Sequence, residues 1–117
     1  SHAMAADVII KIMPDALLIT DLDGRILFAN DEATRVLNGE CEELIGCEFS
    51  KLFKDHKKYD QLYDEVVLHK KEILRYEAEM IDPQGEHLPA LINANLLRDK
   101  VVGGTLGIVF IVRDIRG

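Results

Sequence analysis

Polar and apolar residues alternate along several segments of this chain, a pattern that predicts β-strands. The clearest case is residues 104–115, which split into two sets on opposite faces of a strand. One set comprises Leu106, Ile108, Phe110 and Val112, and the other comprises Gly107, Val109, Ile111 and Arg113. Strands are also predicted over residues 16–22, 25–29, 72–81 and 87–99. The first two flank Asp23-Gly24, which is typical of a tight hairpin turn.

Other segments carry apolar residues at helical spacing. The longest helix is predicted over residues 55–69, where an apolar stripe recurs every three or four positions. The residues of this stripe are Tyr59, Leu62, Tyr63, Val66 and Val67. Shorter helices are predicted after Asn30, a good amino-terminal cap, and over residues 42–45 and 49–53.

An amphipathic helix is also predicted near the amino terminus, over residues 5–13, and Pro14 ends it. Its apolar side is formed by Val8, Ile9, Ile12 and Met13. So short a helix is marginal alone in water, so it must dock on another part of the protein.

Two strands, a run of helices and three further strands predict an α+β fold with an antiparallel sheet. The chain also resembles the PAS domain family over nearly its whole length. The phrases that carry this resemblance are Asp21-Leu22-Asp23-Gly24, Asn30, Leu44-Ile45-Gly46, Asp82 to Gly85, Pro89 and Asp114-Ile115. The resemblance implies a five-stranded sheet in the spatial order 2-1-5-4-3, with short helices on one face and an N-terminal flanking helix.

The predicted organisation is a single domain. Residues 1–3 are interpreted as a cloning remnant, residues 4–14 as the flanking helix and residues 15–117 as one PAS-like domain. A chain of 117 residues, of which 48% are hydrophobic, agrees with one domain that has a substantial core.

Charge and cysteine content argue against several classes of function. With 14 basic and 21 acidic residues the formal charge is −7, which disfavours nucleic-acid binding by this domain. No apolar run approaches the roughly 20 residues that cross a bilayer, so no membrane role is expected of this domain. Cys41 and Cys47 suggest neither a disulfide nor a metal site and are compatible with the cytoplasm.

The register of the PAS family implies an interior between the sheet and the helices, which either is a packed core or holds a mostly apolar ligand. The apolar residues expected to line it are Leu18, Phe28, Val36, Leu62, Val66, Met80, Ala90, Ile92, Phe110 and Val112. The same register turns Leu106 inward and Val109 and Ile111 outward. Thr20 and Asn30 are the expected polar anchors of a ligand.

Two cofactors of the family find little support in these residues. Flavin-binding members place a reactive cysteine where this chain has Phe49, so a flavin is not expected. Haem-binding members use a histidine on the long helix, and His56 is the candidate here. Its charged neighbours indicate an exposed helix start, so the cofactor of this domain, if it has one, stays open.

The expected function is that of a sensory or relay module in a cytoplasmic, bacterial-type signalling protein. The sequence shows no nucleophile–base pair, phosphate-binding glycine loop or metal-ligand spacing, so catalysis is not expected. The resemblance implies a covalently linked effector, such as the histidine kinase of a two-component system or a diguanylate cyclase. The signal would pass through Asp114, Ile115 and Arg116, the last replacing a threonine that is common in the family.

A homodimer is also expected from the resemblance. Its interface would be formed by Val8, Ile9, Ile12, Met13, Val109 and Ile111. Two other functions remain open. The domain could be a haem or apolar small-molecule sensor, or a ligand-free dimerisation module.

Overall fold

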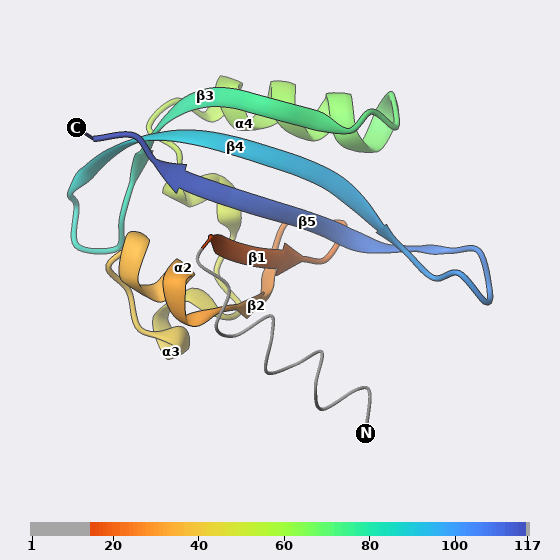
Figure 1. Cartoon of the computed structure of the whole chain (residues 1–117), viewed down its shortest axis with the longest axis horizontal. Helices are drawn as coiled ribbons and strands as arrows, with labels where there is room; N and C mark the ends of the chain where they lie inside the picture. Colours follow the sequence, from red (N-terminus) through yellow and green to blue (C-terminus); the bar gives the residue numbers. More distant parts are fainter. Residues whose placement is uncertain (1–14, 117) are drawn as a thin grey trace.

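The computed structural model describes residues 15–116, which form one antiparallel sheet of five strands (Figure 1). The strands are β1 (Ala16–Thr20), β2 (Ile26–Ala29), β3 (Ile73–Ile81), β4 (His87–Arg98) and β5 (Thr105–Asp114). Their order in space is β2-β1-β5-β4-β3, so the last strand lies at the centre of the sheet. The predicted fold class and strand order are confirmed. The predicted flanking helix lies outside the described residues.

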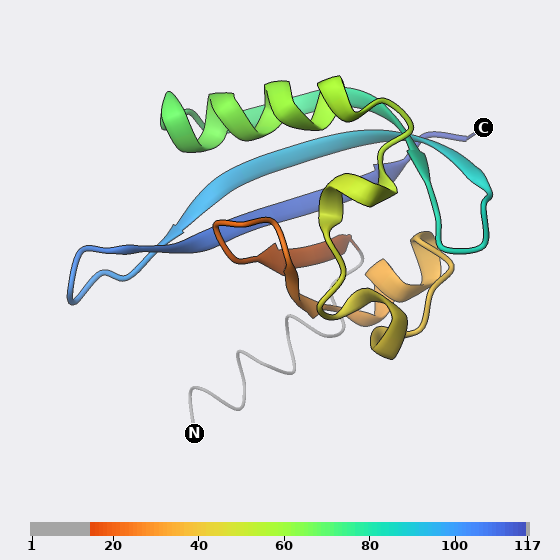
Figure 2. The ribbon, with the colours of Figure 1, turned by 180° about the vertical axis from the view of Figure 1, so that it is seen from behind.

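Short helices connect β2 to β3 and cover one face of the sheet (Figure 2). They are α2 (Asp31–Val36), α3 (Cys41–Leu44), the 3-10 helix η1 (Phe49–Leu52), α4 (His56–Tyr63) and the π-helical turn η2 (Asp64–Leu68). The sequence predicted one α-helix over residues 55–69, whereas the hydrogen bonding changes from α to π after Tyr63. Among the helices of residues 15–116, none has the length and apolar character that a membrane span requires.

Capping interactions explain where the helices begin. The Asn30 side chain accepts a hydrogen bond of 2.9 Å from the N–H of Ala33, and this bond fixes the start of α2. The Asp55 side chain accepts one of 3.0 Å from the N–H of Lys57 at the start of α4. From there α4 buries Leu62 against the sheet, as the predicted apolar stripe requires.

The two faces of the sheet have different environments. On β5, Phe110 is fully buried, and it lies beside Leu18 of β1 and Ala94 of β4 on the inner face. Val109 and Ile111 alternate with it and are half-buried on the outer face. This alternation confirms the predicted orientation of the central part of β5.

Two residues that were expected inside lie elsewhere, so both predictions were wrong. Phe28 pairs with Ile19 on the outer face, because Leu27 is an extra residue in a bulge of β2 and reverses the alternation. Leu106 is 54% exposed. It lies on a part of β5 that projects beyond the core, since β5 pairs with β1 only from Ile108 onward.

Candidate functional site

The predicted pocket residues, apart from Phe28, come together in a single buried cluster. They are Leu18, Val36, Leu62, Val66, Met80, Ala90, Ile92, Phe110 and Val112. The cluster combines the inner face of four strands with the helices above it. The sequence therefore predicted which apolar residues share the interior, although their role in binding a ligand stays a prediction.

Aromatic rings occupy the middle of this interior. The ring of Phe49 is fully buried, with its centroid 4.4 Å from that of Phe110 and 5.3 Å from that of Phe53. The ring of Tyr59 lies 5.4 Å from that of Phe53 and 6.2 Å from that of Phe49. These centroid distances lie within or just below the range of about 4.5–7 Å that is usual for packed aromatic pairs. The space between helices and sheet is therefore filled by side chains around Phe49.

The sequence analysis placed Phe49 in a short predicted helix and at the position of the cysteine of flavin-binding members, but it did not assign Phe49 to the interior. The sequence nevertheless contains a pattern that predicts the burial of Phe49. Phe49, Leu52 and Phe53 are apolar at positions i, i+3 and i+4, which predicts one buried side for that short helix. All three are buried in the structure.

The two predicted polar anchors are both buried and both hydrogen-bonded within the chain. Asn30 Oδ1 accepts bonds of 2.9 Å from the N–H groups of Leu17 and Ala33, and Asn30 Nδ2 donates to the carbonyl of Asp15 at 2.9 Å. Thr20 Oγ1 donates to the carbonyl of Asp21 at 2.8 Å. These bonds join β1 to α2 and shape the β1–β2 turn, so each side chain has a structural role here.

Two tyrosines of α4 hold the β1–β2 turn in different ways. Tyr63 Oη donates a hydrogen bond of 2.7 Å to the carbonyl of Leu22. Tyr59 Oη is buried and has no hydrogen-bond partner among the described residues. Burial, with smaller effects from Tyr63 and nearby carboxylates, raises the pKa of Tyr59 to about 12. The hydroxyl packs directly against Gly24, where a Cβ would lie only 2.6 Å from it.

The outer face of the sheet carries the described part of the predicted dimer interface. Val109 and Ile111 lie there with their β1 partners Ile19 and Leu17. They line a shallow pocket of about 140 Å³ together with Glu72, Ile73, Leu74, Asn93, Ala94 and Asn95. The other predicted interface residues, Val8, Ile9, Ile12 and Met13, lie outside the described residues.

The predicted relay segment at the end of β5 forms a compact turn. Asp114 Oδ1 accepts a hydrogen bond of 2.8 Å from the N–H of Arg116, and Asp114 Oδ2 accepts another of 2.8 Å from the Arg116 guanidinium. This guanidinium holds the pKa of Asp114 below its usual value. The N–H of Ile115 donates to the carbonyl of Pro89 at 3.1 Å, which ties the turn to β4.

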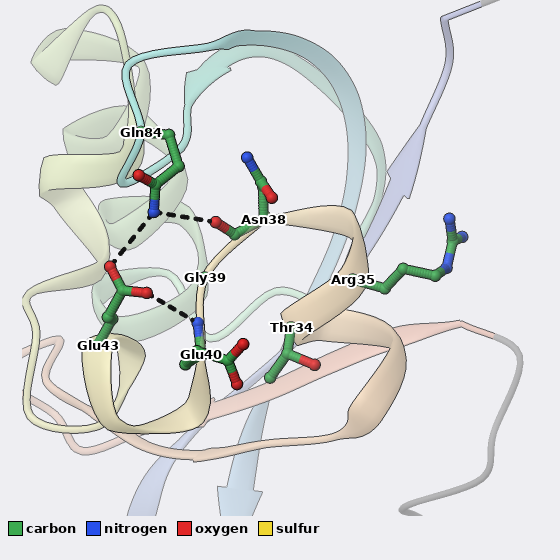
Figure 3. A pocket seen from close by; sticks show the side chains of 7 residues that line it. All are labelled: Thr34, Arg35, Asn38, Gly39, Glu40, Glu43 and Gln84. Carbon is green, nitrogen blue, oxygen red and sulfur yellow. Dashed lines mark hydrogen bonds between the residues drawn. The ribbon is translucent and has the colours of Figure 1, made fainter.

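A polar pocket of about 300 Å³ lies beside the α2–α3 connection and the β3–β4 turn (Figure 3). Its lining residues are Thr34, Arg35, Asn38, Gly39, Glu40, Glu43 and Gln84. Gln84 Nε2 donates to the Asn38 carbonyl and to the Glu43 carboxylate, both at 3.4 Å. The sequence analysis did not single out this pocket, because its residues come from separate segments. In Figure 3 the Arg35 side chain points away from the other lining residues. The remaining charged groups are the carboxylates of Glu40 and Glu43, and such a lining does not indicate a particular class of ligand.

His56 lies outside the buried interior. It is the first residue of α4 and its side chain is exposed. The candidate haem ligand is therefore on the surface of the domain. Within residues 15–116, no group of three His, Cys, Asp or Glu residues is arranged to hold a metal ion. Cys41 is exposed and Cys47 is half-buried, and both are free thiols.

Comparison with known proteins identifies the family. The model of the PAS domain family matches residues 14–116, so this chain belongs to the PAS domain family. None of the curated proteins compared with the chain matches it.

Several solved PAS domains share the fold at low sequence identity. A PAS domain of a Colwellia psychrerythraea protein is 19% identical, with a TM-score of 0.84 and 98% of each chain covered. The PAS domain of an HTR-like protein from Haloarcula marismortui is 16% identical, with a TM-score of 0.79, and 97% of this chain and 92% of that chain are covered. A PAS domain from a two-component sensor histidine kinase is also 16% identical, with a TM-score of 0.80 and coverage of 97% and 96%.

Proposed function

We propose that this domain is a sensory or relay module of a cytoplasmic signal-transduction protein and that it controls a covalently linked effector domain. Its membership of the PAS family supports a role in signalling. The likeness in fold to the PAS domain of a two-component sensor histidine kinase supports an effector of the histidine kinase type. In this proposal the domain transmits a signal and is not itself an enzyme.

The proposal depends mainly on the central position of β5 in the sheet. This central strand places Phe110 and Val112 in the interior and Val109 and Ile111 on the outer face, and it ends at Asp114. A change on either face of the sheet therefore acts on the strand that leads to the end of the domain. The hydrogen-bonded turn formed by Asp114 and Arg116 would pass this change to the effector.

The filled interior favours a signal carried by packing between two copies of the domain. The rings of Phe49 and Phe110 lie in contact at the centre of the interior, where a ligand would otherwise sit. Val109 and Ile111 on the outer face, in contrast, are only half-buried. We therefore place a homodimer ahead of a haem or apolar small-molecule sensor as the working form of the domain.

The test is Asp114→Ala in the full-length protein, with the effector activity as readout. We expect the variant to fold, because Asp114 is partly exposed, but to change or lose the response of the effector to its input. Asp60→Ala, at an exposed position on α4, is the matched control and should respond as the wild type does. An unchanged response of the Asp114→Ala variant would refute the proposed relay.

A further inference from the structure

The β4–β5 hairpin projects from the body of the domain and carries two valines at its tip (Figure 1). Val101 is 94% exposed and Val102 is 81% exposed. Apolar side chains that are displayed together at a projecting end are typical of a surface that another molecule covers.

The tip loop is held in a defined shape by hydrogen bonds. The N–H of Asp99 donates to the carbonyl of Gly104, and the N–H of Gly103 donates to the carbonyl of Asp99, each at 2.8 Å. Asp99 Oδ1 accepts bonds of 2.9 Å and 3.2 Å from the N–H groups of Val101 and Val102. The loop therefore presents the two valines to solvent in a fixed arrangement.

The outer face of the sheet offers a complementary surface. The pocket of about 140 Å³ beside Val109 and Ile111, which we call the socket, is lined mostly by apolar side chains, and its rim carries Glu72. At the tip, Arg98 and Lys100 are exposed cations. The Asp99 carboxylate, in contrast, accepts hydrogen bonds from the N–H groups of Val101 and Val102 inside the loop. The apolar tip thus matches the apolar socket, and its two cations match the one carboxylate of the socket lining, that of Glu72, which also accepts a hydrogen bond of 3.2 Å from Asn95.

The tip cannot reach the socket of its own chain. The two strands between them are paired from Arg98 and Thr105 through to Asn95 and Val109. The seven residue-to-residue steps from Val102 to Val109 span about 23 Å at the rise of a strand. The tip must therefore meet the socket of another molecule.

A second copy of this chain provides both a socket for the tip and a tip for the socket. If the two outer faces pack with antiparallel strands, a two-fold axis near Leu97 and Gly107 puts each tip over the other copy's socket. Such an isologous arrangement forms two identical contacts and closes on itself. Leu97, on the outer face beside Gly107, would then meet its own counterpart at the axis.

We propose that the Val101-Val102 tip of one copy seats in the socket of a second copy and so fixes how the two outer faces align. This inference rests on the proposed homodimer and adds its register and its anchoring residues.

Disulfide trapping tests the contact directly. In a background with Cys41→Ser and Cys47→Ser, Val102→Cys and Leu74→Cys are made as separate variants and oxidised alone and as a mixture. The inference predicts a cross-linked dimer in the mixture that joins the two different variants. If the mixture gives no higher yield of cross-linked dimer than either variant oxidised alone, the result would contradict the contact.

Dimer dissociation constants give an independent measure. By sedimentation, Val101→Asp with Val102→Asp should weaken the dimer by at least about tenfold, since each charge would be buried in an apolar socket. Leu68→Asp is the control, because Leu68 is 65% exposed on η2, away from the sheet's outer face.

The possible outcomes separate the two proposals. A wild-type dimer that the double variant leaves intact, with no cross-link, overturns the seating of the tip but preserves the homodimer. A wild-type monomer overturns both. Loss of binding to anionic lipid vesicles in the double variant, with dimerisation unchanged, would assign the tip to a membrane and likewise overturn the inference.

Discussion

Replacing Phe49 with alanine tests whether the interior is a filled core. The Phe49 ring is fully buried and contacts Phe53 and Phe110, so its removal leaves a cavity that its neighbours cannot easily fill. At about 24 cal/mol per Å³, a cavity of roughly 100 Å³ costs about 2 kcal/mol beyond the lost transfer free energy. We expect the free energy of unfolding to fall by about 3–5 kcal/mol, the usual range for buried phenylalanines.

The assay is urea unfolding, with and without benzene as an apolar probe. Benzene should stabilise the Phe49→Ala variant, because an apolar cavity of this size binds such molecules, but should leave the wild type unchanged. Phe28→Ala is the control, since Phe28 is only half-buried, and it should cost about 1 kcal/mol. A loss below about 1 kcal/mol for Phe49→Ala, or a wild type that benzene already stabilises, would refute a filled interior.

Three further predictions concern single positions. Gly107→Ala should destabilise the fold by about 1–3 kcal/mol in urea unfolding, because its Cβ would overlap a backbone carbonyl oxygen of β1. Gly104→Ala, which meets nothing, should be nearly neutral. Tyr59→Phe should not destabilise the domain, because it removes a buried hydroxyl without a described partner, whereas Tyr63→Phe should cost about 1 kcal/mol. A larger loss for Tyr59→Phe would contradict this. The carboxyl of Asp114 should titrate below 3.8 by NMR. Because the folded state favours its ionised form, the stability that it contributes is complete above that pH and disappears as the pH falls through the lower, folded-state pKa. A value at or above 3.8 would contradict the bond to the guanidinium.

Much of the sheet could be predicted, because alternation and turn residues are local signals. The Asp23-Gly24 turn and the alternation around Phe110 are visible in the sequence, and the structure agrees with both. Phe28 could not be placed correctly, since a single extra residue, Leu27, reverses the alternation and leaves no mark in the hydrophobic pattern.

The candidate site was less predictable, because its features depend on contacts between distant segments. Phe49 and Phe110 are far apart in the sequence but pack ring against ring, so only the folded chain shows that the interior is filled. The change from α to π hydrogen bonding after Tyr63 also lies within an unbroken apolar stripe, which predicts burial but not the helix type. The sequence also does not show that Val101 and Val102 are exposed at the end of a projecting hairpin, because the length of that hairpin depends on how β4 and β5 pair.

Native mass spectrometry of the purified domain, compared with its denatured mass, tests the central claim most directly. If the domain is a relay module with a filled interior that signals through dimer packing, the native species will be a dimer with no mass beyond two chains. A monomer, or a native species that carries the added mass of a haem or another retained small molecule, would contradict this account.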